Sequence, residues 1–296
     1  MNLPLVSILI PLYNHEHYII QCLNSILSDD YKNKEIIIID DCSTDNGYSI
    51  ASEWIKTNNS SYPISLKRNP SNMGICHTLN DLVKISKGEY VLPLASDDGL
   101  IAGSIDNRLA YLEKNKSKMA VFGDCYVIDT NNQVVLDSSL EDLHNADTNQ
   151  FYTEQGLKRQ FIWNWSIVGP SILIDRRAYD AIGFYNEKMR VEDWDFYLRL
   201  VSNDLIGYIN EKVGLYRIHH SNASRRKTFG NIDTEYELLK IAVKNLKNFH
   251  GEYKYLLMKK SLVYIYLIFR KLSIAWKLFS TTSNSILFLQ NFISYF

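Results

Sequence analysis

The chain of 296 residues has only four cysteines, and no two of them form a CxxC pair. This scarcity argues against a zinc site and a disulfide framework, and it fits a reducing compartment. The sequence also lacks a run of about 18 apolar residues, the length that a membrane-spanning helix needs. Its first apolar run, residues 3–13, lacks the flanks of a signal peptide, so we expect none.

Two glycine-rich phosphate-binding patterns are also absent. Residues 11–18, PLYNHEHY, stand where a GxGxxG fingerprint would follow the first strand, and no GxxxxGK[ST] loop occurs. These absences weigh against a dinucleotide cofactor and against ATP bound by backbone amides. With 46% apolar and 22% charged residues, the composition is that of a folded protein with one large domain or two small ones.

The net charge of −1 conceals an uneven distribution along the chain. Residues 240–296 carry nine basic residues and one acidic residue, whereas the remaining 239 residues carry 23 basic and 32 acidic ones. A near-neutral chain with a basic, aromatic tail suggests that the two parts have different tasks. We expect no nucleic-acid partner.

Strand-like and helix-like segments alternate along the first hundred residues. The apolar patterns predict buried strands over 5–12, 35–40, 62–69 and 89–95, and helices over 16–27, 48–55 and beyond residue 74. Such alternation predicts right-handed βαβ units and a mostly parallel sheet with helices on both faces.

The later pattern is less regular. It predicts a strand pair over 119–129 and 133–137, a strand and a short helix over 171–183, a helix over 191–201, a strand over 211–220 and helices beyond 231. Residues 139–168 have no clear period.

Polar side chains follow three of the expected strands. The first ends in PLYN at residues 11–14, the second in Asp40 and Asp41, and the fourth in SDD at residues 96–98. The carboxyl ends of parallel strands share one edge of the sheet, where ligands bind. Each cluster alone is typical of a turn or a helix cap, but three together concentrate negative charge that a cation would stabilise. Oxygen ligands suit Mg²⁺ or Mn²⁺ bridging a nucleotide diphosphate.

Four segments resemble, in order, the successive motifs of the family 2 glycosyltransferases: VSILIPLYNHEHYIIQCLNSIL, EIIIIDDCSTDNG, NPSNMGICHTLNDLVKISKGEYVLPLASDD and VEDWDFYLRL. The resemblance runs from about residue 5 to residue 220. It implies the GT-A fold, an α/β architecture with a mostly parallel nucleotide-binding sheet and flanking helices. It also implies a catalytic domain over 1–225, with a nucleotide-binding half over 1–100 and an acceptor-binding half over 101–225. A helical, basic and aromatic region over 226–296 would follow.

The resemblance assigns the nucleotide to Pro11, Tyr13, Asn14, Asp41 and Asp97. Tyr13 matches the position that stacks on the base, usually uracil, and Pro11 lies beside it. Asp41 matches the carboxylate that accepts a hydrogen bond from the imide N–H of the base. Asp97 matches a ribose or shared metal contact. The implied donor is therefore a UDP-sugar.

The resemblance also implies a divalent metal, Mn²⁺ or Mg²⁺. Asp98 is the first choice for the direct contact, with Asp97 sharing it and His219 matching a position that helps to bind the metal in several members. Many members read Asp-x-Asp-Asp here, whereas this chain has Ala95 at the first position. The substitution leaves Asp97 and Asp98 as the required pair.

Asp193, in VEDWD, matches the catalytic base that takes the proton of the acceptor hydroxyl. One base and a single displacement imply inversion, so a UDP-α-sugar would give a β-linkage. A structural alternative is that the acidic residues near Asp193 only stabilise a helix dipole. Trp163, Trp165, Glu192 and Arg217 are candidates for contacts with the acceptor or the diphosphate, although the tryptophans also suit core packing.

The sequence thus predicts a metal-dependent glycosyltransferase that acts on a glycan or lipid-linked oligosaccharide, as in bacterial O-antigen or capsule synthesis. A catalytically silent nucleotide-sugar-binding subunit is the main alternative, and a retaining or nucleotidyl transferase is a third. The tail either caps the catalytic domain or lies on an anionic membrane surface, and its charge favours the membrane. We expect a cytoplasmic protein, peripheral to the inner face of the cell membrane.

Overall fold

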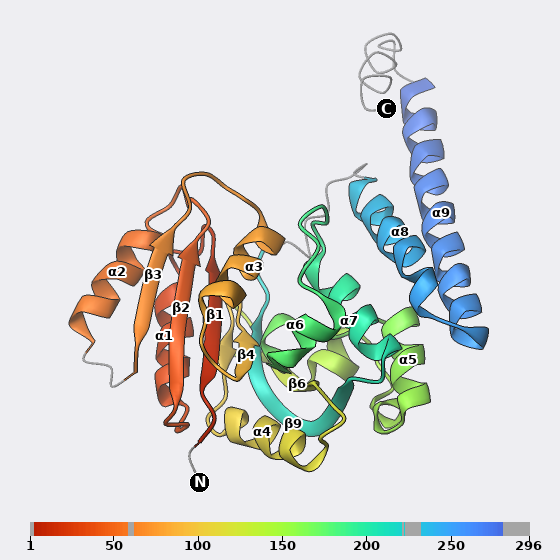
Figure 1. The fold of residues 1–296 in the computed structure, drawn as a ribbon. Coiled ribbons are helices and arrows are strands. Elements are labelled where there is room, and N and C mark those ends of the chain that lie inside the picture. Colours follow the sequence, from red (N-terminus) through yellow and green to blue (C-terminus); the bar gives the residue numbers. More distant parts are fainter. Residues whose placement is uncertain (1–2, 59–61, 221, 223–231, 281–296) are drawn as a thin grey trace. The chain divides into compact units, whose positions relative to one another are not determined.

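The computed structural model describes residues 3–58, 62–220, 222 and 232–280. The chain divides into two compact units, residues 1–222 and residues 223–296. Within its described part, the first unit is built around a single nine-stranded sheet with the order β3-β2-β1-β4-β8-β6-β9-β5, and β7 pairs with β6 (Figure 1). The strands are β1 Val6–Leu12, β2 Lys34–Asp40, β3 Ile64–Arg68, β4 Tyr90–Pro93, β5 Gly99–Leu100, β6 Ala120–Ile128, β7 Val134–Leu136, β8 Ile172–Asp175 and β9 Ile206–Arg217.

The first four strands in the spatial order, β3-β2-β1-β4, are all parallel. Beyond β4 the directions are mixed, because β8 runs antiparallel to both β4 and β6, whereas β6 and β9 are parallel. The predicted α/β class, with a mostly parallel sheet and flanking helices, is confirmed. The helices of this unit are α1 Ile19–Ser28, α2 Gly47–Thr57, α3 Ile75–Ile85, α4 Ser104–Lys114, α5 Glu154–Trp163, α6 Arg177–Ile182 and α7 Glu192–Ser202.

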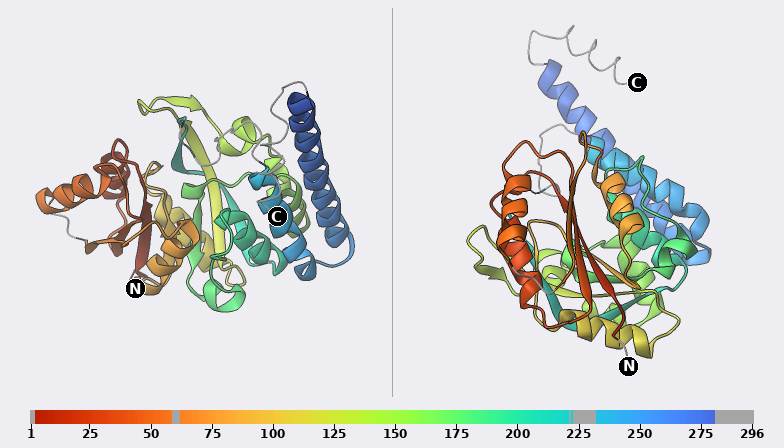
Figure 2. Two further views of the ribbon diagram at one scale, coloured as in Figure 1. Left: turned by 90° about the horizontal axis from the view of Figure 1, so that it is seen from above. Right: turned by 60° about the vertical axis from the view of Figure 1, so that its left-hand side comes forward.

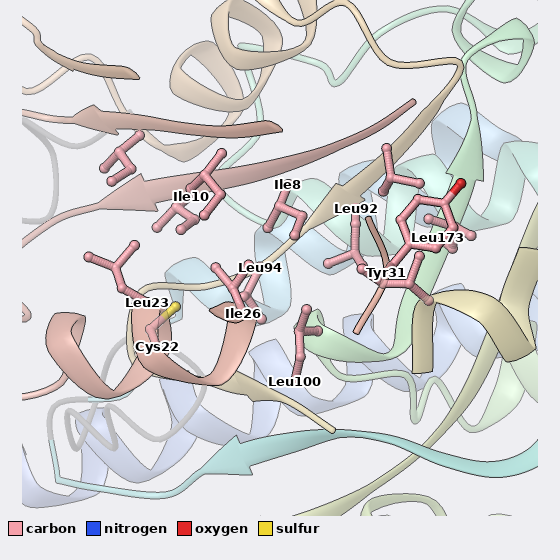
Figure 3. Close-up of a cluster of buried hydrophobic side chains, with 14 of the residues drawn as sticks. Ile8, Ile10, Cys22, Leu23, Ile26, Tyr31, Leu92, Leu94, Leu100 and Leu173 are labelled. Atoms are coloured by element: carbon pink, nitrogen blue, oxygen red, sulfur yellow. The ribbon is translucent and has the colours of Figure 1, made fainter. Parts of the chain in front are cut away.

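The main hydrophobic core lies between the parallel strands and the helices α1, α2 and α4. Side chains alternate between the two faces of a strand, so Ile8 and Ile10 of β1 point to the same side. Figure 3 shows them facing Cys22, Leu23 and Ile26 of α1. Helix α3 covers the opposite face, as the right-hand view of Figure 2 shows. Helices on both faces leave the ends of the strands as the accessible edge.

Among the α-helices and strands that the structure describes, three were not predicted: α4, α5 and the two-residue β5. Helix α5 is short and has a glycine in its first turn, so its helical period is weak. The Thr153 side chain caps it by accepting from Gly156 N at 3.0 Å. A Cβ on Gly156 would lie 2.0 Å from the Gln150 carbonyl oxygen, so this close approach requires glycine.

The second unit contains α8 Asp233–Asn245, the 3₁₀ turn Leu246–Asn248 and α9 Gly251–Ser280. Leu257, Ser261 and Tyr264 form the buried side of α9. Five apolar or aromatic side chains on α9 are 47–66% exposed, and their spacing of three or four residues puts them on one side of the helix. This exposed α9 face consists of Tyr255, Met258, Leu262, Tyr266 and Phe269. Among the described residues, none of the helices combines the length and apolarity needed to cross a membrane.

Candidate active site

The ends of β1, β2 and β4 meet at one edge of the sheet, as expected, because β1 lies between the other two strands. Asn14 connects two of these ends. Its backbone N–H donates to Ser43 Oγ at 3.0 Å, and its side-chain oxygen accepts from Thr44 N at 2.8 Å. Asn14 has a φ of 55°, a left-handed conformation that asparagine tolerates better than most residues. Asn14 therefore lies at the predicted edge of the sheet. Its hydrogen bonds hold the turn after β1 against the residues that follow β2.

Tyr13 and Asp41 occupy the same edge. Tyr13 is 39% exposed, so its ring is available to a planar ligand, and Pro11 precedes it in β1. Asp41 Oδ1 accepts from Met73 N and from the Asn69 side chain, and Oδ2 accepts from Gly74 N at 2.9 Å. Since a carboxylate oxygen has two lone pairs, Oδ2 keeps one for a further donor.

Asp97 is held between two histidines. Its Oδ2 lies 2.9 Å from His219 Nε2, and its Oδ1 lies 3.6 Å from His15 Nδ1. His15 Nδ1 is also hydrogen-bonded to Ser96 Oγ at 2.8 Å. The structure thus brings together Asp97 and His219, both predicted, with His15, which was not predicted. Ligand atoms of these three side chains lie within 4.8 Å of one another and could hold a metal ion.

The protonation of Asp97 follows from these neighbours. Burial alone would raise the pKa of Asp97, but the hydrogen bond from His219 and the charges of His15 and His219 together outweigh it. The pKa of Asp97 is therefore lowered, and the ionised carboxylate is favoured. Burial lowers the pKa of His15, and the charge of Asp97 partly opposes this effect. The charge of His15 that favours an ionised Asp97 is lost when the imidazole is neutral, and the neutral imidazole is the form that binds a cation together with the carboxylate.

Asp98, the residue expected to make the direct metal contact, has a different environment. Its Oδ1 accepts from Arg217 N at 2.8 Å. It is not part of the set of ligand atoms around Asp97, and burial and the charge of Asp97 raise its pKa well above the usual value. Its Oδ2 faces Gly169, 3.6 Å from the position that a Cβ would take there. The Ala95 Cβ lies 4.0 Å from the same position, so residue 95 is close to Gly169 and its small side chain fits beside it.

Arg217, an expected diphosphate contact, is only 2% exposed. Its guanidinium donates to the backbone carbonyls of Asp97 and Asp129 at 2.8 and 2.7 Å, and it lies 5.1 Å from the ring centroid of Tyr18. The Tyr18 ring in turn lies 4.8 Å from that of His219. In this structure Arg217 therefore supports the loop that carries Asp97 and does not present its charge to a ligand.

Glu192 and Asp193 begin α7, and both are half-buried. Asp193 Oδ1 accepts from the backbone N–H of Trp194 at 2.7 Å. Burial raises the pKa of Glu192 to about 6. Burial, followed by the charge of Glu192, raises the pKa of Asp193 well above its usual value. A carboxylate that binds a proton this readily has the property that a general base requires.

Helix α3 connects the start of α7 with the sheet edge that carries Tyr13 and Asp41. At its first turn Gly74 N donates to Asp41, and the Cys76 thiol donates to the Met189 carbonyl just before α7. Further along α3, the Asn80 side chain donates to the Tyr185 carbonyl at 2.9 Å. The same short helix thus contacts both Asp41 at the sheet edge and the segment that leads into Asp193.

The two tryptophans of the 139–168 segment differ in their surroundings. Trp163 ends α5 and is 46% exposed. Trp165 stacks on Trp194, with ring centroids 6.1 Å apart and an interplanar angle of 22°. Its buried Nε1 has no hydrogen-bond partner within the described part of the chain. Trp163 is thus partly exposed, whereas Trp165 packs beside the start of α7.

The sequence reasoning missed His15, Tyr18 and Asn222. Asn222 Nδ2 donates to the Arg217 carbonyl at 3.0 Å and approaches Asp97 Oδ2 at 3.5 Å. One signal for His15 was present, because it follows the PLYN turn directly and so lies at the sheet edge where Asp97 was expected. No sequence signal identified Tyr18 or Asn222, since the Tyr18 ring lies beside His219 and Asn222 approaches Asp97, and both of these partners are distant in the sequence.

The family model of glycosyl transferase family 2 matches residues 7–183. The chain belongs to this family, and it is a glycosyltransferase. It is 25% identical to an uncharacterized glycosyltransferase of Methanocaldococcus jannaschii, over 84% of this chain and 83% of that protein. It is 26% identical to the putative colanic acid biosynthesis glycosyl transferase WcaA of Escherichia coli, over 68% of this chain and 67% of WcaA.

Solved glycosyltransferases share the fold. The TarS fragment 1–349 of Staphylococcus aureus, in complex with UDP-GlcNAc, matches 84% of this chain and 69% of its own, with a TM-score of 0.64 and 19% identity. The mannosyltransferase PcManGT of Pyrobaculum calidifontis, in complex with GDP-Man and Mn²⁺, matches 99% of this chain and 80% of its own, with a TM-score of 0.65 and 17% identity. These matches confirm the GT-A fold.

Proposed function

We propose that the chain is an inverting, metal-dependent glycosyltransferase that moves a sugar from a UDP-sugar to a hydroxyl of a glycan. The observation that carries this proposal is the presence of two groups: the cluster of Asp97, His15 and His219, whose ligand atoms lie within 4.8 Å of one another, and Asp193, a half-buried carboxylate at the start of α7. The first suits a metal-bound diphosphate, and the second suits the removal of a proton.

The donor assignment rests on the nucleotide edge. The exposed ring of Tyr13 would stack on the base, with Pro11 beside it and Asn14 shaping the turn. The remaining lone pair on Asp41 Oδ2 would accept the imide N–H of uracil, which cytosine lacks. The complexes of TarS with UDP-GlcNAc and of PcManGT with GDP-Man are consistent with a nucleotide-sugar donor.

In the reaction, Asp193 would take the proton from the acceptor hydroxyl as its oxygen attacks the anomeric carbon. The new glycosidic bond forms as the bond to the diphosphate oxygen breaks, and UDP leaves. Asp97 and His219 would hold the divalent ion, Mn²⁺ or Mg²⁺, which would neutralise the leaving diphosphate. Trp163 and Glu192 are available to the acceptor.

We assign Asp98 and Arg217 differently from the expectation based on the sequence. Their mutual hydrogen bond, and the bond from Arg217 to the Asp97 carbonyl, would keep the metal-binding loop in position. In this proposal neither residue contacts the metal or the diphosphate.

A donor screen tests the proposal. Purified protein with Mn²⁺ should release UDP from one UDP-sugar, and anomeric NMR of a transferred product should show inversion. Retention would contradict the single-displacement mechanism. UDP binding without turnover of any donor, given an acceptor preparation, would favour the silent nucleotide-sugar-binding subunit.

For the acceptor, we propose a lipid-linked oligosaccharide of a bacterial surface polysaccharide, reached from the cytoplasmic side of the membrane. In this proposal the catalytic domain spans residues 1–225, and the helical region 226–296 binds anionic lipid. The exposed α9 face supports this assignment, because its apolar side chains are flanked by Lys259 and Arg270. Such a face suits the boundary between headgroups and acyl chains.

Vesicle co-sedimentation tests the membrane assignment. The chain should bind vesicles containing phosphatidylserine and lose binding in the triple variant Leu262→Gln, Tyr266→Gln, Phe269→Gln. The matched control is Val134→Gln with Val135→Gln, which removes exposed apolar side chains from β7 of the first unit. Equal binding by both variants, or none by the wild type, would contradict the assignment and favour a helical cap.

A further inference from the structure

His15 is a partly buried histidine beside Asp97, unlike the nearby His17. It follows the end of β1, and its side chain is 22% exposed, whereas that of His17 is 80% exposed. The His15 ring lies edge-on to that of His219, with centroids 5.8 Å apart and an interplanar angle of 90°. His15 therefore lies near one carboxylate oxygen of Asp97, and His219 lies near the other.

The ligand atoms of the three side chains lie close enough together to converge on one ion, since all are within 4.8 Å of one another. Neighbouring ligand atoms around an octahedral ion with bonds of about 2.1 Å lie about 3 Å apart. His219 Nε2 lies 2.9 Å from Asp97 Oδ2, and His15 Nδ1 lies 3.6 Å from Asp97 Oδ1. Small side-chain movements would thus place all three on one ion. The Ser96 hydroxyl, now hydrogen-bonded to His15 Nδ1, would have to release that nitrogen.

We propose that His15 is a third protein ligand of the metal, and that this chain therefore binds a first-row transition ion before the nucleotide arrives. This inference rests on the proposed metal site at Asp97 and His219. With two side-chain ligands, an ion depends on the diphosphate to complete its coordination, whereas a third ligand raises the affinity of the free protein. Two imidazole nitrogens also favour Mn²⁺ over Mg²⁺, which prefers oxygen.

The test measures metal binding without nucleotide. Titration of the metal-stripped full chain with Mn²⁺, followed by electron paramagnetic resonance of the free ion, should reveal one site. His15→Gln should weaken binding by about 10-fold or more, because even the loss of a group that only orients a metal ligand costs about 10- to 100-fold. The control His17→Gln, two residues away and exposed, should leave binding unchanged. Mg²⁺ should displace Mn²⁺ more easily from His15→Gln than from the wild type.

A second readout shows whether His15 touches the metal or only supports the site. Pulsed electron paramagnetic resonance of bound Mn²⁺ should detect nitrogen couplings from two imidazoles in the wild type and from one in His15→Gln. Unchanged couplings would overturn the proposal, as would equal Mn²⁺ affinity in the two proteins or no binding by the wild type without nucleotide. Circular dichroism confirms that the variant is folded.

Failure of this inference is distinguishable from failure of the proposed function. Because the titration uses no sugar donor, Mn²⁺ binding that depends on His15 would stand even if no sugar were transferred. Conversely, Mn²⁺-dependent transfer with normal kinetics in His15→Gln would preserve the transferase proposal and refute the role of His15.

Discussion

Two carboxylates of the first unit, Asp97 after β4 and Asp193 at the start of α7, differ in the direction of their pKa shifts. Burial acts on both and favours the neutral acid. Asp97 overcomes it because His15 and His219 lie beside it, whereas Asp193 has the acidic Glu192 as its neighbour in the chain. The comparison teaches that the partner, and not burial itself, decides which buried carboxylate stays charged.

The largest expected effect comes from removing the base. Asp193→Asn should lower kcat by about 10²- to 10⁴-fold, the usual contribution of general acid–base catalysis, and leave UDP affinity nearly unchanged. Steady-state kinetics and calorimetry would measure the two quantities. The control is Asp180→Asn, an exposed acidic residue of α6. Transfer at the normal rate by Asp193→Asn would refute the assignment of the base.

The next largest effect distinguishes Asp97 from Asp98, the two adjacent acidic residues that follow β4. Asp97→Asn should reduce Mn²⁺-dependent activity by about 100-fold or more, since the charge of the ligand is lost. Asp98→Asn should keep most of the activity, because asparagine resembles the neutral carboxyl group that its surroundings favour. The Mn²⁺ dependence of initial rates measures both. The reverse order of effects would restore Asp98 as the direct ligand.

A smaller effect concerns the pH dependence. The raised pKa of Asp193 means that the base form increases as the pH rises, so kcat/KM should fall on the acidic side of its pH profile. Glu192→Gln removes the neighbouring negative charge, and the acidic limb should therefore move to lower pH. In the wild type, the apparent pKa of this acidic limb belongs to Glu192 and Asp193 together, because the two carboxylates are coupled. A shift to higher pH would show that Glu192 does not act on Asp193 through its charge.

The smallest effect is on stability. A Glu192 pKa raised from 4.5 to about 6 means that folding disfavours its charge. Glu192→Gln should thus increase the free energy of unfolding by about 1–2 kcal/mol at pH 7. This gain should be complete above pH 6, decline between pH 6 and pH 4.5, and vanish below. Urea denaturation at pH 7 and pH 4 measures it, and equal gains at both pH values would exclude the electrostatic cause.

The strands that end at Asn14, Asp41 and Asp97 were predicted better from the sequence than the region around helix α5. The strands ending near Asn14, Asp41 and Asp97 are continuous apolar runs, and their parallel order fixes where those residues lie. Helix α5 escaped prediction because its glycine and its brief period resemble a loop. The contact of Arg217 with the Asp97 carbonyl also escaped, because it joins residues 120 positions apart.

The βαβ order of the first hundred residues and the membership in glycosyl transferase family 2 can be read from the amino-acid sequence, because local apolar patterns and the order of the motifs specify both. The protonation of the carboxylates depends on the folded structure. His219 is 122 residues from Asp97 and His15 is 82 residues before it, so their electrostatic effect exists only when the sheet edge and the end of β9 meet.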